Sequence, residues 1–363
     1  MGIQYHQPLH LKSTGLDLDY NVFAENQAAA EYALGLLQGS QKKLQNPDLL
    51  ISPLSAKEAA VSSKIEGTQS TVSDVFLHEA GGRTRHSDIQ EVVNYRRTIN
   101  FAIKKISTEK RITIPMVRQL HRSLLENTRH KGTLGAFRQK DVWIAARAGD
   151  PIDKALYIPP HYSQIQSYID NLWEYINNGK ENTLLKAGVI HYQFEAVHPF
   201  EDGNGRIGRL LIPLILHHKN QLSTPILYIS GYMENHRDEY INSLHDVDRT
   251  GRIEPWLSFF FKSVGEQLKE TQSIVERIYA LYDGVRGTFG MTKSPYLIPF
   301  LDFVFATPMF TVPQATQQMR ASSRLTTIRL IKLFQEKNII RESPIHLKRA
   351  KLYAFEPLLK ILK

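Results

Sequence analysis

The stretch from His198 to Arg209 gathers most of the residues in this chain that could do chemistry. It reads His-Pro-Phe-Glu-Asp-Gly-Asn-Gly-Arg-Ile-Gly-Arg. The histidine has a proton affinity that suits general base work near neutral pH. The carboxylate of Asp202 is the kind of oxygen ligand that Mg²⁺ prefers. At Gly203 and Gly205 the backbone is nearly bare, so N–H groups can come close to a bound anion.

A helix is predicted directly after these glycines. The apolar run from Leu210 to Leu216 indicates a buried helix that begins between Asn204 and Gly208. Its free N–H groups and the positive end of its dipole would form an anion site. Arg206 and Arg209 are three residues apart and so point to the same side of such a helix. Guanidinium groups bind phosphate oxygens as a fork, which suits a polyphosphate ligand.

Taken as a pattern, the stretch reads H-x-F-x-[DE]-G-N-G-R-x-x-R and resembles the signature of the Fic family at every fixed position. That family mostly transfers AMP from ATP to a hydroxyl group of a target protein. The resemblance implies that His198 deprotonates the acceptor hydroxyl and that Asp202 holds the Mg²⁺ that bridges the α- and β-phosphates. It assigns nucleotide contacts to Gly203, Asn204, Gly205, Arg206, Ile207, Gly208 and Arg209. In this assignment the first three form the anion hole and the two arginines hold the outer phosphates.

A second pattern, Ser62-x-x-x-Glu66-Gly67, ends a predicted helix. Local sequence alone favours a solvated acid near a helix end. The pattern also resembles the inhibitory motif of many Fic proteins. That resemblance implies that Glu66 pairs with Arg209, keeps the γ-phosphate from docking productively and leaves the isolated protein nearly inactive.

Two short β-type runs, over 141–145 and 155–158, predict a hairpin with its turn at Arg147–Pro151. Such a hairpin on a helical protein has an unpaired edge that can accept another strand, or it can serve as a structural cover. In Fic proteins the matching hairpin, called the flap, aligns the target backbone beside the catalytic histidine. The resemblance therefore implies a target protein that docks its acceptor hydroxyl on the 141–158 hairpin.

A helix over 183–197 leads into the motif and places His191, Glu195 and His198 on one face. Di-iron and zincin sites need further carboxylates or histidines that the chain lacks. A core or supporting role is therefore expected for His191, and Glu195 is expected to orient His198. Tyr240 is assigned to the nucleotide pocket because similar proteins place an aromatic contact there.

Periodicity and capping residues predict a mainly helical chain after an irregular arm over 1–20. In one helix, Ser55 is expected as the N-cap and Glu58 to complete a capping box. The predicted helices cover 21–37, 56–65, 71–80, 88–106, 113–125, 163–176, 183–197, 204–216, 231–244, 253–268 and 271–282. Three segments follow from these elements. They are an N-terminal helical segment over 1–110 that carries the inhibitory helix, a Fic-type catalytic core with a β-hairpin flap over 111–285, and a winged-helix domain over 290–363.

The C-terminal segment carries most of the excess charge. Nine Lys or Arg residues against two acids give +7 between Thr311 and Phe355, within a net charge of +9 for the whole chain. Helices over 297–305, 311–319 and 325–337 followed by strands over 339–341 and 352–355 predict a winged helix-turn-helix. Arg324, Arg329 and Lys332 would lie on its recognition helix. DNA binding and contact with protein, including a second copy of this chain, are equally consistent with this pattern.

Composition narrows the class of protein. The 363 residues include no cysteine, so no disulfide, thiol nucleophile or cysteine metal site is available. No signal-peptide pattern or bilayer-length apolar run is present, which predicts a soluble, cytoplasmic protein without a membrane partner. The expected function is autoinhibited transfer of AMP from ATP, with Mg²⁺ as cofactor, to Ser, Thr or Tyr of a target protein or of the chain itself. The alternatives are removal of AMP, transfer of another phosphate-containing group, and a nucleotide-sensing DNA-binding regulator.

Overall fold

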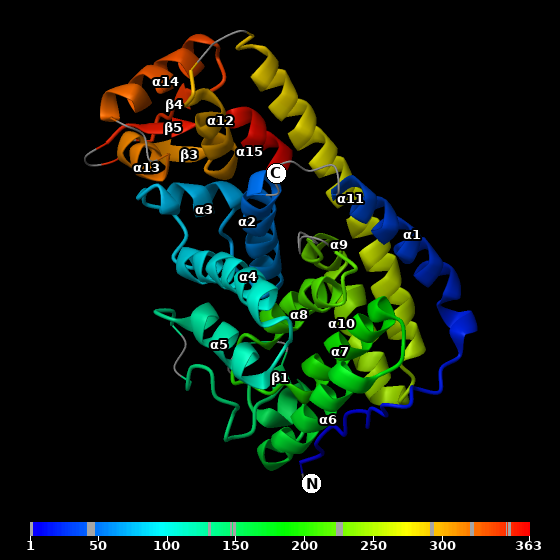
Figure 1. Ribbon diagram of the computed structural model, residues 1–363. Helices are drawn as coiled ribbons and strands as arrows, with labels where there is room; N and C mark the ends of the chain where they lie inside the picture. Colours follow the sequence, from blue (N-terminus) through cyan, green and yellow to red (C-terminus); the bar gives the residue numbers. More distant parts are fainter. Residues whose placement is uncertain are drawn as a thin grey trace. The chain divides into compact units, whose positions relative to one another are not determined.

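The computed structural model describes residues 3–41, 48–129, 132–145, 147, 150–222, 228–290, 294–319, 323–345, 347 and 350–363. The chain forms two compact units (Figure 1). Unit 1 comprises Met1–Gly39 and Arg97–Leu268, and unit 2 comprises Ser40–Arg96 and Lys269–Lys363. The chain passes between the units inside three helices, α1 (Ala24–Gln41), α4 (Ile89–Glu109) and α11 (Glu254–Gly287). The consecutive domains predicted above stay a prediction.

Unit 1 is built around α7 (Thr183–Val197), whose side chains are almost all buried. It lies beside α8 (Asn204–His218), and α6 (Ile165–Asn178) and α10 (Arg237–Thr250) pack against it (Figure 1). This unit also contains most of α1 (Ala24–Gln41), together with α5 (Ile114–Leu125), α9 (Ser230–Asn235) and the antiparallel hairpin of β1 (Ile144–Ala145) and β2 (Ala155–Tyr157). The helix and hairpin predictions around the motif are confirmed. The predicted turn residues Ala148 and Gly149 lie outside the described residues.

Local capping explains where the site-bearing helices begin. The side chain of Asn182 accepts the N–H of Leu184 and starts α7 at the predicted residue. Thr113 caps α5 through the N–H of Met116. Such caps satisfy N–H groups that have no partner within the helix.

Unit 2 contains α2 (Asp48–Ile65), α3 (Val72–Glu79) and the C-terminal elements α12 (Leu297–Ala306), β3 (Met309–Thr311), α13 (Val312–Gln318), α14 (Arg324–Glu336), β4 (Arg341–Glu342), β5 (Leu352–Ala354) and α15 (Glu356–Leu362). The three strands form an antiparallel sheet in the order β3-β5-β4. The predicted order of helices followed by a hairpin is confirmed, and the structure adds β3 and α15.

Three helix boundaries predicted from local patterns are wrong. Ser55 does not cap a helix, because α2 begins at Asp48 and the Ser55 hydroxyl donates to the carbonyl of Ser52 inside it. The predicted break at Thr271 is absent, since α11 continues through this fully buried residue. The helix predicted over 231–244 divides into α9 and α10 at His236. No helix in the described part of the chain is both long enough and apolar enough to cross a bilayer.

Candidate functional site

His198 ends α7 in a left-handed backbone conformation. Its φ is 48° and its ψ is 60°, and its N–H donates to the carbonyl of Phe194. This region is uncommon for residues other than glycine and costs about 1–3 kcal/mol, so the surroundings must hold it in place. The imidazole Nδ1 lies 3.3 Å from the carbonyl oxygen of Glu195. Because that oxygen can only accept, Nδ1 carries the hydrogen and Nε2 is the basic nitrogen.

The loop between α7 and α8 is pinned by two buried side chains. Asn204 accepts the N–H of Phe200 at 2.9 Å and donates to the carbonyl of the same residue at 3.0 Å. His121, from α5, stacks on the Phe200 ring with the ring centroids 3.9 Å apart. Its Nε2 donates to the carbonyl of Asp202, while Nδ1 accepts the N–H of Gly135. These contacts fix the loop relative to α5.

Asp202 and Arg206 come together at the start of α8, and Arg209 follows in the next turn of this helix. Gly203 precedes this helix with a φ of 78° and supplies no side-chain cap, so the helix presents its first N–H groups and positive dipole end to the loop. Arg206 and Arg209 are 2% and 1% exposed. The Asp202 side chain is 52% exposed, and its Oδ1 lies 3.5 Å from a guanidinium nitrogen of Arg206. The predicted anion site and a carboxylate therefore adjoin one another.

Ile207 and Gly208 face inward in α8, where both are buried. A Cβ added at Gly208 would come within 2.2 Å of Glu195 Oε1 and 3.3 Å of His191 Nδ1. Glycine at this position therefore lets α8 approach α7 closely, which brings the start of α8 beside the end of α7.

His191 and Tyr240 form a buried support beneath the motif. The Tyr240 hydroxyl lies 2.9 Å from His191 Nε2, and Tyr240 is 4% exposed. The indole of Trp256 stacks on the His191 ring with centroids 5.5 Å apart. Burial, with a smaller contribution from the Arg209 guanidinium, lowers the pKa of His191 to about 3. The contact of Tyr240 with a nucleotide stays a prediction.

Metal coordination by several side chains finds no support. In the described ranges, no group of three or more His, Asp or Glu residues could hold a metal ion. The face shared by His191, Glu195 and His198 therefore makes no such cluster.

Arg138 is a positioning residue that the sequence analysis missed. It is 3% exposed, and its Nε donates to the carbonyl of His198 at 2.9 Å. Its Nη2 donates to the carbonyl of Pro160 at 2.6 Å, and its backbone N–H donates to the carbonyl of Pro199. One side chain thus joins the motif loop to the segment that follows the hairpin. A lone arginine before a polar stretch gives no local pattern by which to find it.

Glu66 lies in unit 2, in the exposed turn that follows α2. Its N–H donates to the carbonyl of Ser63, and Gly67 continues the turn with a φ of 99°. Ser62 is fully buried in the last turn of the helix. The helix end and its glycine are confirmed, whereas the pairing of Glu66 with Arg209 stays a prediction.

Several curated proteins resemble parts of this chain. A probable protein adenylyltransferase of Aquifex aeolicus is 30% identical over 95 residues, which are 26% of this chain and 27% of that protein. Protein adenylyltransferase fic-1 of Caenorhabditis elegans is 28% identical over 156 residues, which are 42% of this chain and 27% of the relative. The chain thus aligns with about a quarter of the length of these relatives.

Solved structures share the fold. A Fic family protein from Desulfovibrio desulfuricans aligns over 94% of this chain and 98% of its own, with a TM-score of 0.60 and 18% identity. Fic-1 of C. elegans aligns over 70% of this chain and 74% of its own, with a TM-score of 0.54 and 18% identity. At these identities the likeness concerns the fold.

Family models cover both the segment before the motif and the motif itself. The Fic/DOC family N-terminal model matches residues 24–104, and the Fic/DOC family model matches residues 111–216. Together they span just over half of the chain, and the second contains the complete motif of His198–Arg209. The chain belongs to the Fic/DOC family.

Proposed function

We propose that this chain is an autoinhibited protein adenylyltransferase that moves AMP from ATP to a Ser, Thr or Tyr hydroxyl. The observation that carries the proposal is the juxtaposition at the end of α7. A histidine with Nε2 as its basic nitrogen lies in the same loop as a half-exposed carboxylate and the N-terminus of α8. The names of the aligned relatives support the same activity.

In the proposed reaction the acceptor oxygen attacks the α-phosphorus of ATP. The new bond joins that oxygen to the AMP group, the bond to the β-phosphate oxygen breaks, and pyrophosphate leaves. Nε2 of His198 takes the hydroxyl proton. Arg206 and Arg209 hold the outer phosphates, and the N–H groups at the start of α8 offset the charge on the transferred group.

The residues present fit a magnesium ion. Asp202 offers a half-exposed oxygen donor beside a helix N-terminus suited to phosphate, and Mg²⁺ in such sites takes one or two carboxylates together with substrate phosphates. Asp202 would hold the ion, which would neutralise negative charge on the substrate phosphates.

Inhibition by Glu66 is part of the proposal and rests on the Ser62-x-x-x-Glu66-Gly67 pattern. Because a carboxylate competes with an anionic substrate for a guanidinium, Glu66→Gly is expected to raise incorporation of α-labelled ATP into protein about 10-fold or more. The measurement uses the full chain with Mg²⁺. Glu109→Gly, which changes an exposed glutamate at the end of α4, is the matched control and should leave labelling unchanged.

The position of the label separates the alternatives. Incorporation from α-labelled but not γ-labelled ATP supports AMP transfer, whereas incorporation from the γ position indicates phosphoryl transfer. Release of AMP from a labelled protein by the wild type would indicate the reverse reaction. If neither the wild type nor Glu66→Gly incorporates label from α-labelled ATP, the proposed activity is wrong.

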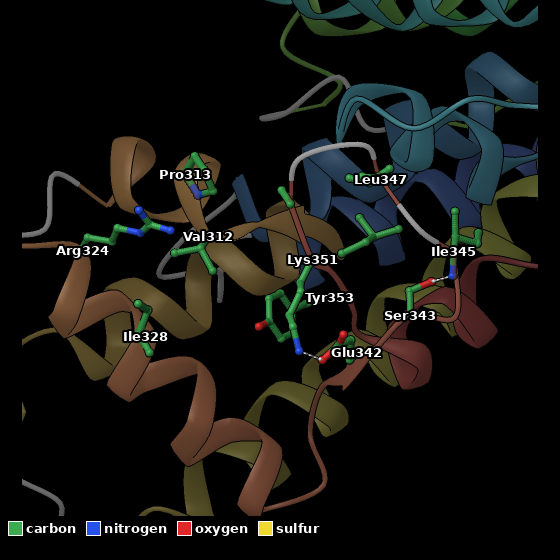
Figure 2. A pocket seen from close by; sticks show the side chains of 12 residues that line it. Val312, Pro313, Arg324, Ile328, Glu342, Ser343, Ile345, Leu347, Lys351 and Tyr353 are labelled. Carbon is green, nitrogen blue, oxygen red and sulfur yellow. Dashed lines mark hydrogen bonds and ion pairs between the residues drawn. The ribbon is translucent and has the colours of Figure 1, made fainter.

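The C-terminal part of unit 2 supports a second candidate function, DNA binding through a winged helix. Arg324, Arg329 and Lys332 are exposed on α14. A cavity of about 670 Å³ lies between α14 and the β4–β5 segment. Figure 2 shows Arg324 and Ile328 on one side of it and Glu342, Lys351 and Tyr353 on the other. A cationic helix face beside a hairpin is suited to the major groove and its phosphates. Three of the nine basic residues counted between Thr311 and Phe355, namely Arg320, Lys348 and Arg349, lie outside the described residues.

Salt dependence tests this candidate. Replacing Arg324, Arg329 and Lys332 with Gln is expected to weaken binding of the full chain to a mixed-sequence duplex. It should also reduce the slope of log K against log[salt] by about 3, since each lost phosphate contact removes about 0.9. Lys337→Gln, an exposed cation just after α14, is the control. Absence of wild-type binding at low salt excludes a DNA-binding function and leaves protein contact as the role of this domain.

A further inference from the structure

The segment from Tyr5 to Leu11, here called the N-terminal strap, has no regular secondary structure but is tied to several elements of unit 1. Pro8 and Leu11 are buried in it. An irregular segment keeps one conformation only where side chains and backbone groups hold it, because ordering each residue costs conformational entropy. Its contacts therefore show which parts of unit 1 it holds.

Two strap residues touch the two ends of the β1–β2 hairpin. The Tyr5 hydroxyl donates to Asp141 Oδ2 at 2.8 Å, three residues before β1. The backbone N–H of His6 donates to the carbonyl of Ile158 at 2.9 Å, directly after β2. The other oxygen of Asp141 accepts the N–H of Tyr162 at 3.3 Å. The strap thus closes the base of the hairpin from both sides.

The rest of the strap is fixed to helices. The side chain of Gln193, in α7, donates to the carbonyl of Leu9 at 2.7 Å. The amide of Asn171, in α6, binds Leu11 at both its N–H and its carbonyl, at 2.9 and 2.8 Å. The strap therefore connects the hairpin base to α7, the helix that ends at His198.

A second layer of contacts links the same parts. Tyr157, the last residue of β2, donates its hydroxyl to the carbonyl of Ala196 at 2.5 Å. The His6 ring lies 5.3 Å from the Tyr157 ring, and its Nε2 lies 3.2 Å from Asp248 Oδ1 in α10. His6 therefore packs against the residue that joins β2 to α7.

The hairpin depends on such support because its described strands have only two and three residues. A two-stranded ribbon of this length is marginally stable by itself. We propose that the N-terminal strap holds the hairpin in a fixed position relative to His198 and so positions the acceptor segment of the target. This inference rests on the proposed transferase function, since it assigns the strap a role in that reaction.

Hydrogen exchange of the hairpin amides tests the strap without any reaction. Deleting residues 2–7 removes the Tyr5 and His6 contacts and leaves Pro8, Leu9 and Leu11 in place. Loss of two hydrogen bonds is expected to speed exchange at 144–145 and 155–157 about 10- to 30-fold, while exchange in α8 stays unchanged. Tyr168→Phe is the matched control, because it removes the bond from Tyr168 to Gln7 without touching the hairpin.

Transfer kinetics test the role in catalysis. The acceptor in this assay is dephosphorylated casein, and the enzyme carries Glu66→Gly. The deletion is expected to raise about 10-fold the casein concentration at which labelling is half-maximal. The KM for ATP should not change. Hairpin exchange equal to that of the wild type would overturn the inference, whether or not casein is labelled. Faster exchange throughout α8 with a raised KM for ATP would also overturn it, since the strap would then support all of unit 1. If the deletion speeds exchange of the hairpin amides as expected but no variant transfers AMP, the proposed function is refuted and the role of the strap in holding the hairpin stands.

Discussion

His198→Ala, made in the Glu66→Gly background, is expected to lower AMP transfer about 10²- to 10⁴-fold, the usual contribution of a positioned general base. The expectation follows from the Glu195 carbonyl beside Nδ1, which makes Nε2 the nitrogen that takes the proton. The measurement is the initial rate of incorporation of α-labelled ATP. Binding of ATP should persist, because the phosphate contacts assigned to Arg206 and Arg209 remain.

The backbone at His198 calls for a second variant. With a φ of 48°, this position strains most residues, whereas asparagine enters the left-handed region readily. His198→Asn therefore keeps the turn while removing the base, and it should match His198→Ala in rate and the wild type in thermal stability. Transfer by His198→Asn within about 3-fold of the parent would contradict the assigned role, since a lost general base costs far more.

The sequence predicted the centre of the site because its parts are consecutive in the chain. His198 lies at the end of α7, Asp202 in the loop that follows and Arg209 near the start of α8, so local geometry alone sets their order. The start of α8 at Asn204 and the end of α7 at Val197 agree with the predicted boundaries. In a motif of this kind, the consecutive residues themselves form the helix end, loop and helix start that position the functional side chains.

Contacts between distant residues could not be predicted. His121 and Arg138 hold the motif loop from 81 and 60 residues away along the chain. Neither belongs to a pattern that sets it apart from other polar residues. Their partners are mainly backbone carbonyls, which every residue supplies, so only the folded chain identifies them.

Local helix patterns failed where burial outweighed them. The pattern at Ser55 predicts a helix start, but α2 packs along α12 and continues through this residue. A separate helix is predicted from Thr271, yet this residue is fully buried inside α11. One N-cap contributes about 1 kcal/mol to the stability of a helix. Apolar contacts over several turns contribute more, so a helix continues through a residue that could have capped it.

Acidification is expected to destabilise unit 1 through His191. This imidazole is fully buried beside Tyr240 from α10, Glu195 from α7, Arg209 from α8 and Trp256 from α11, and its pKa is lowered to about 3. In the unfolded chain the pKa returns to about 6.5, so below that pH the unfolded state binds a proton that the folded state does not. The free energy of unfolding therefore falls as the pH drops from about 6.5 to 3, by up to about 5 kcal/mol.

His191→Asn separates this contribution from that of the carboxylates. The amide cannot titrate, so the difference in unfolding free energy between wild type and variant should shift in favour of the variant by about 1.4 kcal/mol per pH unit below 6.5. The measurement is urea unfolding at a series of pH values, read by the fluorescence of the tryptophans. Tyr240→Phe is the control, because it removes the hydroxyl partner of His191 but keeps the titrating ring, and the wild-type pH dependence should remain. If the difference in unfolding free energy between wild type and His191→Asn stays constant from pH 7 to 4, His191 takes up its proton in the folded protein. The buried pair of His191 and Tyr240 would then tolerate a positive charge.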